Sequence, residues 1–120
     1  MGSQNFDLEE RLLEYSVRII KLVEQLPHTK TGGHIGGQLL RSGTSPYANH
    51  GEAQAAESSK DFIHKMSISL KEANETEYWL LLLKEGEYME ANKMDSLSKD
   101  IDELIRLLVS IIKTMKGKVK

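Results

Sequence analysis

The stretch that decides the fold is LRSGTSPYANHGEA, residues 40–53. Its two glycines and its Ser-Pro pair are typical of a loop. Helical patterns lie on both sides of it, however, and a long loop without regular structure would be unusual in a chain of 120 residues. If these residues are helical, they complete a helical bundle; if they are not, three amphipathic helices lack the fourth element that would cover their core.

Apolar residues predict helices over about residues 6–26, 59–85 and 93–116, because in each range they recur at spacings of three and four. Pro27 and Gly86 follow the first and third helices, where helix stops are expected. The predicted core stripes are Leu8, Leu12, Tyr15, Ile19, Leu22 and Leu26; Phe62, Met66, Ser69, Ala73, Thr76, Leu80 and Leu83; and Met94, Leu97, Ile101, Leu104, Leu108, Ile111 and Met115.

The remaining helix is predicted over about residues 30–56, with a bend near 43–46, because Pro46 removes one backbone donor and disfavours helical geometry at Ser45. The alternative is two short helices with a break between them. Glycine costs a helix about 1 kcal/mol relative to alanine, so repeated glycines indicate close packing of helix backbones. Those at a spacing of four are Gly32 with Gly36 and Gly33 with Gly37.

Residues that cap helices stand before two of the predicted helices. Ser58 with Asp61 three residues later resembles a capping box. Thr29 or Thr31 is placed to cap the preceding helix. The sequence therefore predicts an all-α, up-and-down antiparallel four-helix bundle, formed as a single domain over residues 1–120.

Composition limits the functional classes. Sixteen basic and eighteen acidic residues give a formal charge of −2, a poor overall balance for a nucleic-acid binder. The basic residues are concentrated, since no acid occurs from Gln25 to Gly51 or after Glu103. The chain has no cysteine, no signal-peptide pattern and no apolar run long enough to span a bilayer. We therefore expect a cytoplasmic protein with no membrane partner.

Motifs of enzymes and cofactor sites are missing from the sequence. The glycine-rich segment TGGHIGGQ, residues 31–38, has neither the spacing of a dinucleotide fingerprint nor the Gly-Lys-Ser/Thr of a phosphate loop. The four histidines form no HExxH motif and no pair four residues apart on one helix. We therefore expect no catalytic residues, no metal site and no cofactor.

A second stripe on the third helix suggests a subunit interface, because it mixes charged, aliphatic and aromatic residues. The alternative is that it only widens the core face. Another set of polar residues recurs at helical spacing around the predicted bend. These residues either line a binding groove or form a structural network. In such a network, Arg41 would pair with Glu52 or with an acid of the third helix. The interface residues are Ile68, Glu72, Glu75, Trp79 and Leu82, and the polar residues are Arg41, Ser45, Asn49 and Glu52.

In an up-and-down bundle, the end of the second helix, the start of the third and the end of the fourth meet at one pole. Basic residues from these segments are candidates for phosphate binding, although acids at the start of the first helix partly cancel them. Together with one arginine near the bend, the candidate nucleic-acid contacts are Arg41, His50, Lys60, Lys113 and Lys116.

Residues 38–83, QLLRSGTSPYANHGEAQAAESSKDFIHKMSISLKEANETEYWLLLL, resemble the bacterial four-helix-bundle family associated with intervening sequences in 23S rRNA genes. Its most distinctive part is SKDFIHKMSISLKEANETEYWL, residues 59–80, and RIIKLVEQLPHTKTGGHIGGQLLRSGTS, residues 18–45, resembles its first and second helices. The resemblance implies a left-handed bundle that assembles as a homopentamer and is often labelled a ribosomal protein. It also implies a distant similarity to the accessory protein of diversity-generating retroelements, a basic pentamer that partners a reverse transcriptase and nucleic acid. The family has no established catalytic residues to carry over.

The function expected from these observations is that of a non-catalytic, homo-oligomeric bundle, a pentamer, with an accessory association with RNA. The alternative is a scaffold for protein–protein interaction that binds a protein partner and no nucleic acid. Clustered lysines at one pole would favour RNA, and an exposed apolar patch would favour a protein partner.

Overall fold

Four α-helices make up the part of the chain that the structure, a computed structural model, describes: residues 3–119, with side chains from 8 to 118. No strand occurs within this part. The bounds differ by no more than a few residues from those predicted. The helices are α1 (Ser3–Glu24), α2 (Lys30–Gln54), α3 (Ser59–Glu85) and α4 (Ala91–Val119).

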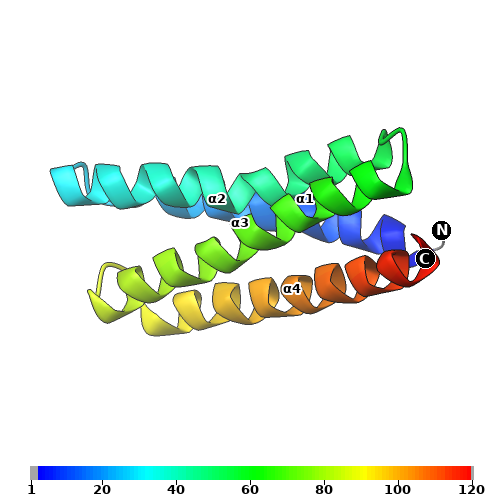
Figure 1. Cartoon of the computed structure of the whole chain (residues 1–120). Helices are drawn as coiled ribbons and strands as arrows, with labels where there is room; N and C mark the ends of the chain where they lie inside the picture. The colour runs from blue at the N-terminus through cyan, green and yellow to red at the C-terminus, as the bar shows by residue number, and fades with distance from the viewer. Residues whose placement is uncertain (1–2, 120) are drawn as a thin grey trace.

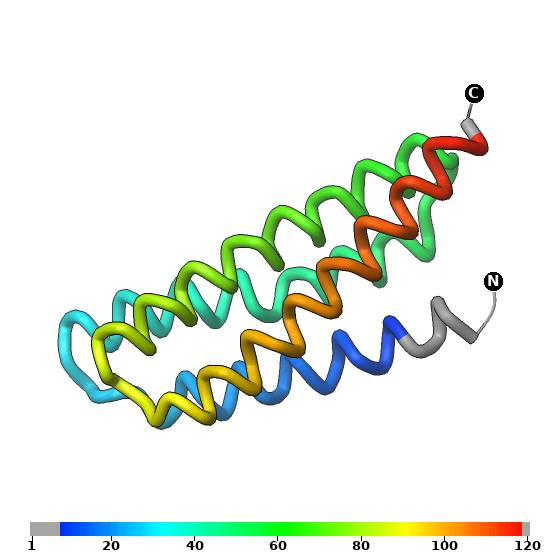
Figure 2. Tube along the Cα trace, turned by 90° about the horizontal axis from the view of Figure 1, so that it is seen from below, coloured from blue at the N-terminus to red at the C-terminus, as the bar shows by residue number. Residues whose placement is uncertain are grey.

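Each helix packs against the two that adjoin it, so that α1 and α3 lie diagonally across the bundle, as do α2 and α4 (Figures 1 and 2). The molecule is elongated, with principal extents of 48 × 24 × 20 Å. The predicted fold class, an all-α up-and-down four-helix bundle, is confirmed. The left-handed sense and the bend in α2 stay predictions.

The two ends of the bundle differ in which segments they carry. The α2–α3 loop and the end of α4 lie together at one end (Figure 1). The α1–α2 and α3–α4 loops lie together at the other end. Residues far apart in the sequence are thereby brought to the same pole.

The deciding stretch, residues 40–53, is helical throughout and lies within the continuous helix α2. The alternative of two short helices is therefore wrong. Pro46 is buried, and its carbonyl oxygen accepts a hydrogen bond from the Ser69 hydroxyl of α3 at 3.0 Å. Contacts with α3 thus help to hold the proline within the helix.

The core matches the predicted stripes closely. All six predicted residues of α1 are buried, and so are most of those on α3 and α4. The prediction is wrong near the end of α4, where Ile112 is buried and Ile111 and Met115 are only partly covered. The stripe therefore shifts by one residue in the last turns of this helix.

The predicted helix caps are present. The Thr29 hydroxyl oxygen accepts from the backbone N–H of Gly32 at 3.0 Å, and the Ser58 hydroxyl oxygen accepts from that of Asp61 at 3.0 Å. These bonds satisfy two of the N–H groups that a helix start leaves unpaired.

The glycines of α2 fall into two groups. Gly36 and Gly43 are buried against α1, and a Cβ atom on Gly43 would lie 2.7 Å from Cγ2 of Ile19. Gly33 and Gly37 are exposed, and a Cβ atom there would meet nothing within 4 Å. The prediction of close helix packing is confirmed for Gly36 and wrong within the chain for Gly33 and Gly37. Gly32 is also buried, but the atom nearest to an added Cβ would be the carbonyl oxygen of Pro27, in the segment between α1 and α2 rather than in a helix.

Candidate nucleic-acid interface

Three of the five candidate nucleic-acid contacts lie at one end of the bundle, which we call the lysine end. Lys60 stands in the first turn of α3, and Lys113 and Lys116 stand in the last two turns of α4. All three are exposed, and none joins an ion pair among the side chains of residues 8–118. No carboxylate within residues 8–118 therefore compensates their ammonium groups.

Acidic residues share this end with the lysines. Glu9 and Glu10 are exposed on the first turns of α1, and Glu57 is exposed in the α2–α3 loop. Glu52 is compensated, because its carboxylate pairs with Lys65 of α3 at 2.8 Å. The lysine end of one chain is thus a mixed surface, on which three lysines stand beside three exposed acids, and strong binding of RNA would require several copies.

His50, another predicted contact, does not belong to this surface. Its side chain is only 1% exposed, and its Nδ1 atom has no hydrogen-bond partner among the described residues. Nε2 lies 3.4 Å from the side-chain nitrogen of Gln54. The prediction is wrong because His50 stands on the buried face of α2, in line with Pro46 and Ala53, and cannot reach a phosphate.

The burial of His50 predicts a loss of stability as the pH falls. Burial lowers the pKa of this histidine below its ordinary value of about 6.5, although Glu9 partly opposes the shift. The unfolded chain then binds a proton that the folded chain rejects, so stability is complete above about pH 6.5 and falls as the pH drops toward the folded pKa. We expect the melting temperature to fall between about pH 7 and pH 5, and the fall to be smaller in His50→Gln.

The quantity to compare is the slope of melting temperature against pH. This slope is unaffected by any loss of stability that a substitution causes equally at every pH. His64 is exposed on α3, so His64→Gln should keep the slope of the parent protein and serves as the control. Equal slopes for the parent and His50→Gln would contradict the assignment of this pH dependence to His50.

Arg41 lies away from the lysine end, in the middle of α2, and its charge is already compensated. Its guanidinium donates to the carboxylates of Glu72 and Glu75 on α3. The predicted pairing with an acid of the third helix is therefore present, and the alternative pairing with Glu52 is not. An arginine bound to two carboxylates is a weak phosphate contact, so the structure counts against Arg41 as a nucleic-acid residue.

The predicted polar set does not form one network. Ser45 and Asn49 bond within α2, where the Asn49 amide donates to the Ser45 hydroxyl at 2.9 Å and to the Ser45 carbonyl at 3.0 Å. Arg41 and Glu52 bond separately to α3, at different heights of the bundle. The set was expected to act as a unit because its spacing is helical, but each charged member finds a partner on another helix.

The predicted interface stripe of α3 faces α2 more than it faces solvent. Glu72 and Glu75 bind Arg41, and the indole N–H of Trp79 donates to Glu75 at 2.8 Å. The Trp79 ring also meets the ring of His34 edge to face, with centroids 6.1 Å apart. Most of this stripe is thus an intramolecular seam between α2 and α3. Ile68 is partly buried, and of the five residues only Leu82 is a strongly exposed apolar residue, at 53%.

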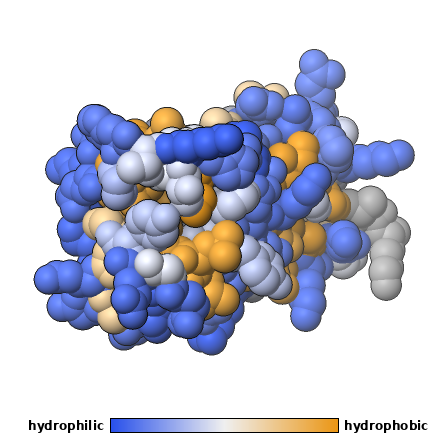
Figure 3. All heavy atoms as spheres, turned by 90° about the vertical axis from the view of Figure 1, so that its left-hand side faces the viewer, coloured by the Kyte–Doolittle hydropathy of each residue, from blue (hydrophilic) through white to orange (hydrophobic). Residues whose placement is uncertain are grey.

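The exposed apolar surface lies beside that stripe and on a second helix. On α3, Tyr78 is 71% exposed and Leu81 is 51% exposed. Figure 3 looks onto the end opposite the lysine end, toward which α3 runs, and shows apolar side chains at the surface between hydrophilic ones. We call Tyr78, Leu81 and Leu82 the α3 apolar face.

The outer side of α1 carries a similar surface, which none of the predicted stripes includes. Leu13, Val17 and Ile20 are each at least 40% exposed. Their spacings of four and three place them on one side of α1, away from its core stripe. The same periodicity that located the core would have located this face, which we call the α1 apolar face.

The described residues give no evidence of a metal centre or a membrane segment. No three His, Asp or Glu side chains within residues 8–118 are grouped to hold a metal ion. No helix between residues 3 and 119 is long and apolar enough to cross a membrane.

Comparison with known proteins gives matches over most of the chain. The family model of the 23S rRNA-intervening sequence protein matches residues 4–110. A crystal structure at 1.70 Å resolution, of a protein with unknown function from the S23 ribosomal protein family of Bacteroides thetaiotaomicron VPI-5482, is 44% identical. That match covers 92% of this chain and 98% of the other, with a TM-score of 0.87. No match was found among curated proteins.

Proposed function

Because the chain belongs to the family of 23S rRNA-intervening sequence proteins, we propose that it is a non-catalytic, homo-oligomeric protein of the cytoplasm that associates with RNA as an accessory partner. The observation that carries the RNA association is the lysine end, where Lys60, Lys113 and Lys116 are exposed and free of ion pairs within residues 8–118. Six of the seven ion pairs among the side chains of residues 8–118 join two helices, and the seventh lies within α4, an arrangement typical of structural pairs.

Self-assembly is supported by the two apolar faces. They lie on α1 and α3, which are diagonal in the bundle, so they point to opposite sides of the molecule. Exposed apolar patches on a monomer typically mark interaction sites. If the α3 apolar face of one copy covers the α1 apolar face of the next, the contact is heterologous, and a heterologous contact closes into a ring when the rotation permits. We propose a pentameric ring.

Assembly would also strengthen phosphate binding at the lysine end. Each copy contributes the same three lysines, so a ring displays them repeatedly around one side. A single cluster of three lysines beside several acids binds phosphate weakly, whereas linked copies gain affinity through multivalency. The net charge of −2 per chain is compatible with this arrangement, because binding depends on the local surface rather than on the total charge.

RNA binding is tested by fluorescence anisotropy of a labelled, structured RNA across a series of salt concentrations. We expect binding that weakens steeply with salt, because lysine–phosphate contacts release counterions. Lys113→Glu combined with Lys116→Glu should weaken binding by about tenfold or more and flatten the salt dependence.

The matched control is Lys30→Glu combined with Lys99→Glu. These two lysines are exposed away from the lysine end, and the double change alters the net charge equally. It should leave the affinity within about twofold. Equal losses in both double variants would show that only total charge matters, and no binding at low salt would reject the RNA association.

The second candidate function is a scaffold that binds another protein and no nucleic acid. The exposure of Tyr78, Leu81 and Leu82 favours it, because such a face suits a protein partner. The two functions differ in their response to the lysine substitutions. If the parent protein binds no RNA, and if Lys113→Glu/Lys116→Glu binds a protein partner as strongly as the parent does, the scaffold function is the correct one.

A further inference from the structure

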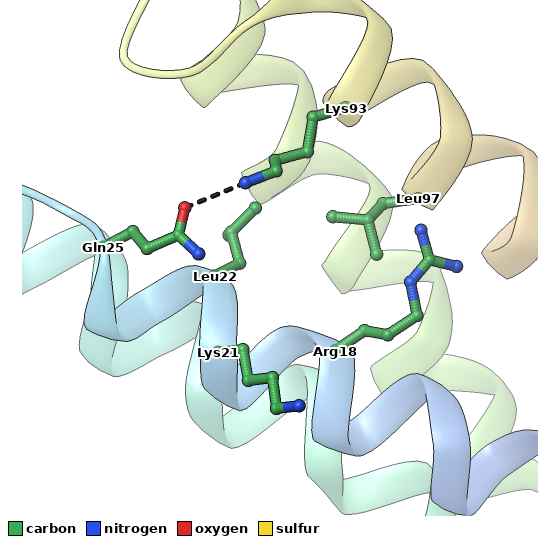
Figure 4. A pocket seen from close by; sticks show the side chains of 6 residues that line it. All are labelled: Arg18, Lys21, Leu22, Gln25, Lys93 and Leu97. Carbon is green, nitrogen blue, oxygen red and sulfur yellow. Dashed lines mark hydrogen bonds between the residues drawn. The ribbon is translucent and has the colours of Figure 1, made fainter.

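A pocket lies between α1 and α4 near the end of the bundle opposite the lysine end (Figure 4). Its volume is about 170 Å³. It is separate from the α1 and α3 apolar faces and from the lysine end. Its lining residues are Arg18, Lys21 and Leu22 of α1, Gln25 directly after α1, and Lys93 and Leu97 of α4.

The floor of the pocket is apolar and belongs to the core. Leu22 and Leu97 are 3% and 2% exposed, and in Figure 4 they lie between the two helices with their side chains directed toward each other. At the pocket, the contact between α1 and α4 therefore leaves two core side chains open to the surface. An apolar group placed there would leave water and contact both leucines.

The rim of the pocket is cationic. The Lys93 ammonium reaches across the seam and donates to the side-chain oxygen of Gln25 at 2.9 Å, which leaves its charge uncompensated. Lys21 takes part in no ion pair among the described side chains, while Arg18 is paired with Asp100. No acidic side chain lines the pocket. Two free ammonium groups on flexible stems thus stand beside an apolar floor.

From this arrangement we infer that the pocket binds a small amphipathic anion, a carboxylate or phosphate carried on an apolar body about the size of one aromatic ring. The apolar body would rest on Leu22 and Leu97, and the anionic head would lie between Lys21 and Lys93. The size follows from the volume, because a cavity of about 150 Å³ accommodates benzene in another protein. The Gln25 amide also offers N–H donors to the head group.

The inference does not depend on the proposed function. The pocket and the lysine end lie at opposite ends of the bundle, so RNA binding and anion binding can be altered separately. The phosphates of RNA would contact the lysines of the pocket but not its apolar floor. A small amphipathic anion uses both, and this difference is what the experiment measures.

The probe is phenyl phosphate, titrated into protein with ¹³C-labelled leucine methyl groups and followed by NMR. We expect saturable shifts of the Leu22 and Leu97 methyl signals and no shift at Leu108, which is buried further along α4. Inorganic phosphate and benzyl alcohol carry the two halves of the probe, and each should bind at least about tenfold more weakly than phenyl phosphate.

Lys21→Glu combined with Lys93→Glu should weaken phenyl phosphate binding by at least about tenfold. Lys113→Glu combined with Lys116→Glu changes the net charge equally at the opposite end and should leave it within about twofold. Three results would overturn the inference: absence of shifts at Leu22 and Leu97, equal binding of inorganic phosphate or benzyl alcohol, or equal effects of the two double variants.

Discussion

Gly43→Ala is expected to lower the free energy of unfolding by about 1–2 kcal/mol, although alanine favours a helix by about 1 kcal/mol. The added Cβ atom would lie 2.7 Å from Cγ2 and 2.9 Å from Cγ1 of Ile19. Ile19 is fully buried, and these atoms lie next to its branch point, so they cannot move aside without separating α1 from α2. Urea denaturation at one protein concentration measures the change.

Gly37→Ala is the matched control on the same helix. Its added Cβ atom would meet nothing within 4 Å, so the substitution should stabilise the protein by up to about 1 kcal/mol through helix propensity alone. In an Ile19→Ala background, most of the cost of Gly43→Ala should vanish, because the two closest atoms, Cγ2 and Cγ1 of Ile19, are gone. If both glycine substitutions shift the free energy of unfolding in the same direction, the account that Gly43 is needed for close packing of α1 and α2 is wrong.

Thr76→Val is expected to lower the free energy of unfolding by about 1–3 kcal/mol, because it leaves a buried hydroxyl without its partner. The hydroxyl oxygens of Ser42 and Thr76 lie 3.1 Å apart between α2 and α3, and both side chains are fully buried. The Thr76 oxygen also lies 2.9 Å from the carbonyl oxygen of Glu72, so its single proton can serve that carbonyl while Ser42 donates to Thr76. Valine has a similar shape but no hydroxyl.

Replacing both hydroxyls separates lost bonding from lost packing. Ser42→Ala combined with Thr76→Val removes the unpaired group, so the double variant should be more stable than Thr76→Val alone. Thermal or urea unfolding of the three variants measures the coupling. Additive losses would mean that the two hydroxyls do not act as a pair.

Most of the fold could be predicted from the sequence because most of the information needed was local. The stripe from Leu8 to Leu26 predicted the core of α1, and the hydroxyls of Thr29 and Ser58 cap helices as their positions predicted. Residues 40–53 were predicted to be helical by elimination, since only a fourth helix could cover the other three.

The candidate site was less predictable because its residues depend on partners from other helices. The helical spacing of Arg41 and Glu52 suggested one network, but Glu72, Glu75 and Lys65 on α3 compete for them. Periodicity counts apolar residues, so it gave no indication that a histidine at position 50 would occupy a core position.

The α1 apolar face can be detected from the sequence. Leu13, Val17 and Ile20 share the spacing of the core stripe, but the core stripe alone was enough to predict the helix. Where one helix carries two apolar faces on opposite sides, the second indicates a contact outside the bundle.

Single substitutions on the two faces test the heterologous contact. Val17→Glu on the α1 apolar face and Leu81→Glu on the α3 apolar face should each prevent assembly, because each removes one half of every junction. A mixture of the two variants should form a species of two chains, since each supplies the face that the other lacks. Assembly that survives either substitution would mean that the affected face is not part of the junction.

The most direct test of the central claim, that copies of the chain join through these faces, is the molar mass of the parent protein by light scattering during gel filtration at micromolar concentrations. We predict a single species with five times the chain mass of 13.6 kDa. A mass of 13.6 kDa at every concentration would contradict the claim, because both apolar faces would then stay exposed to water in the working protein.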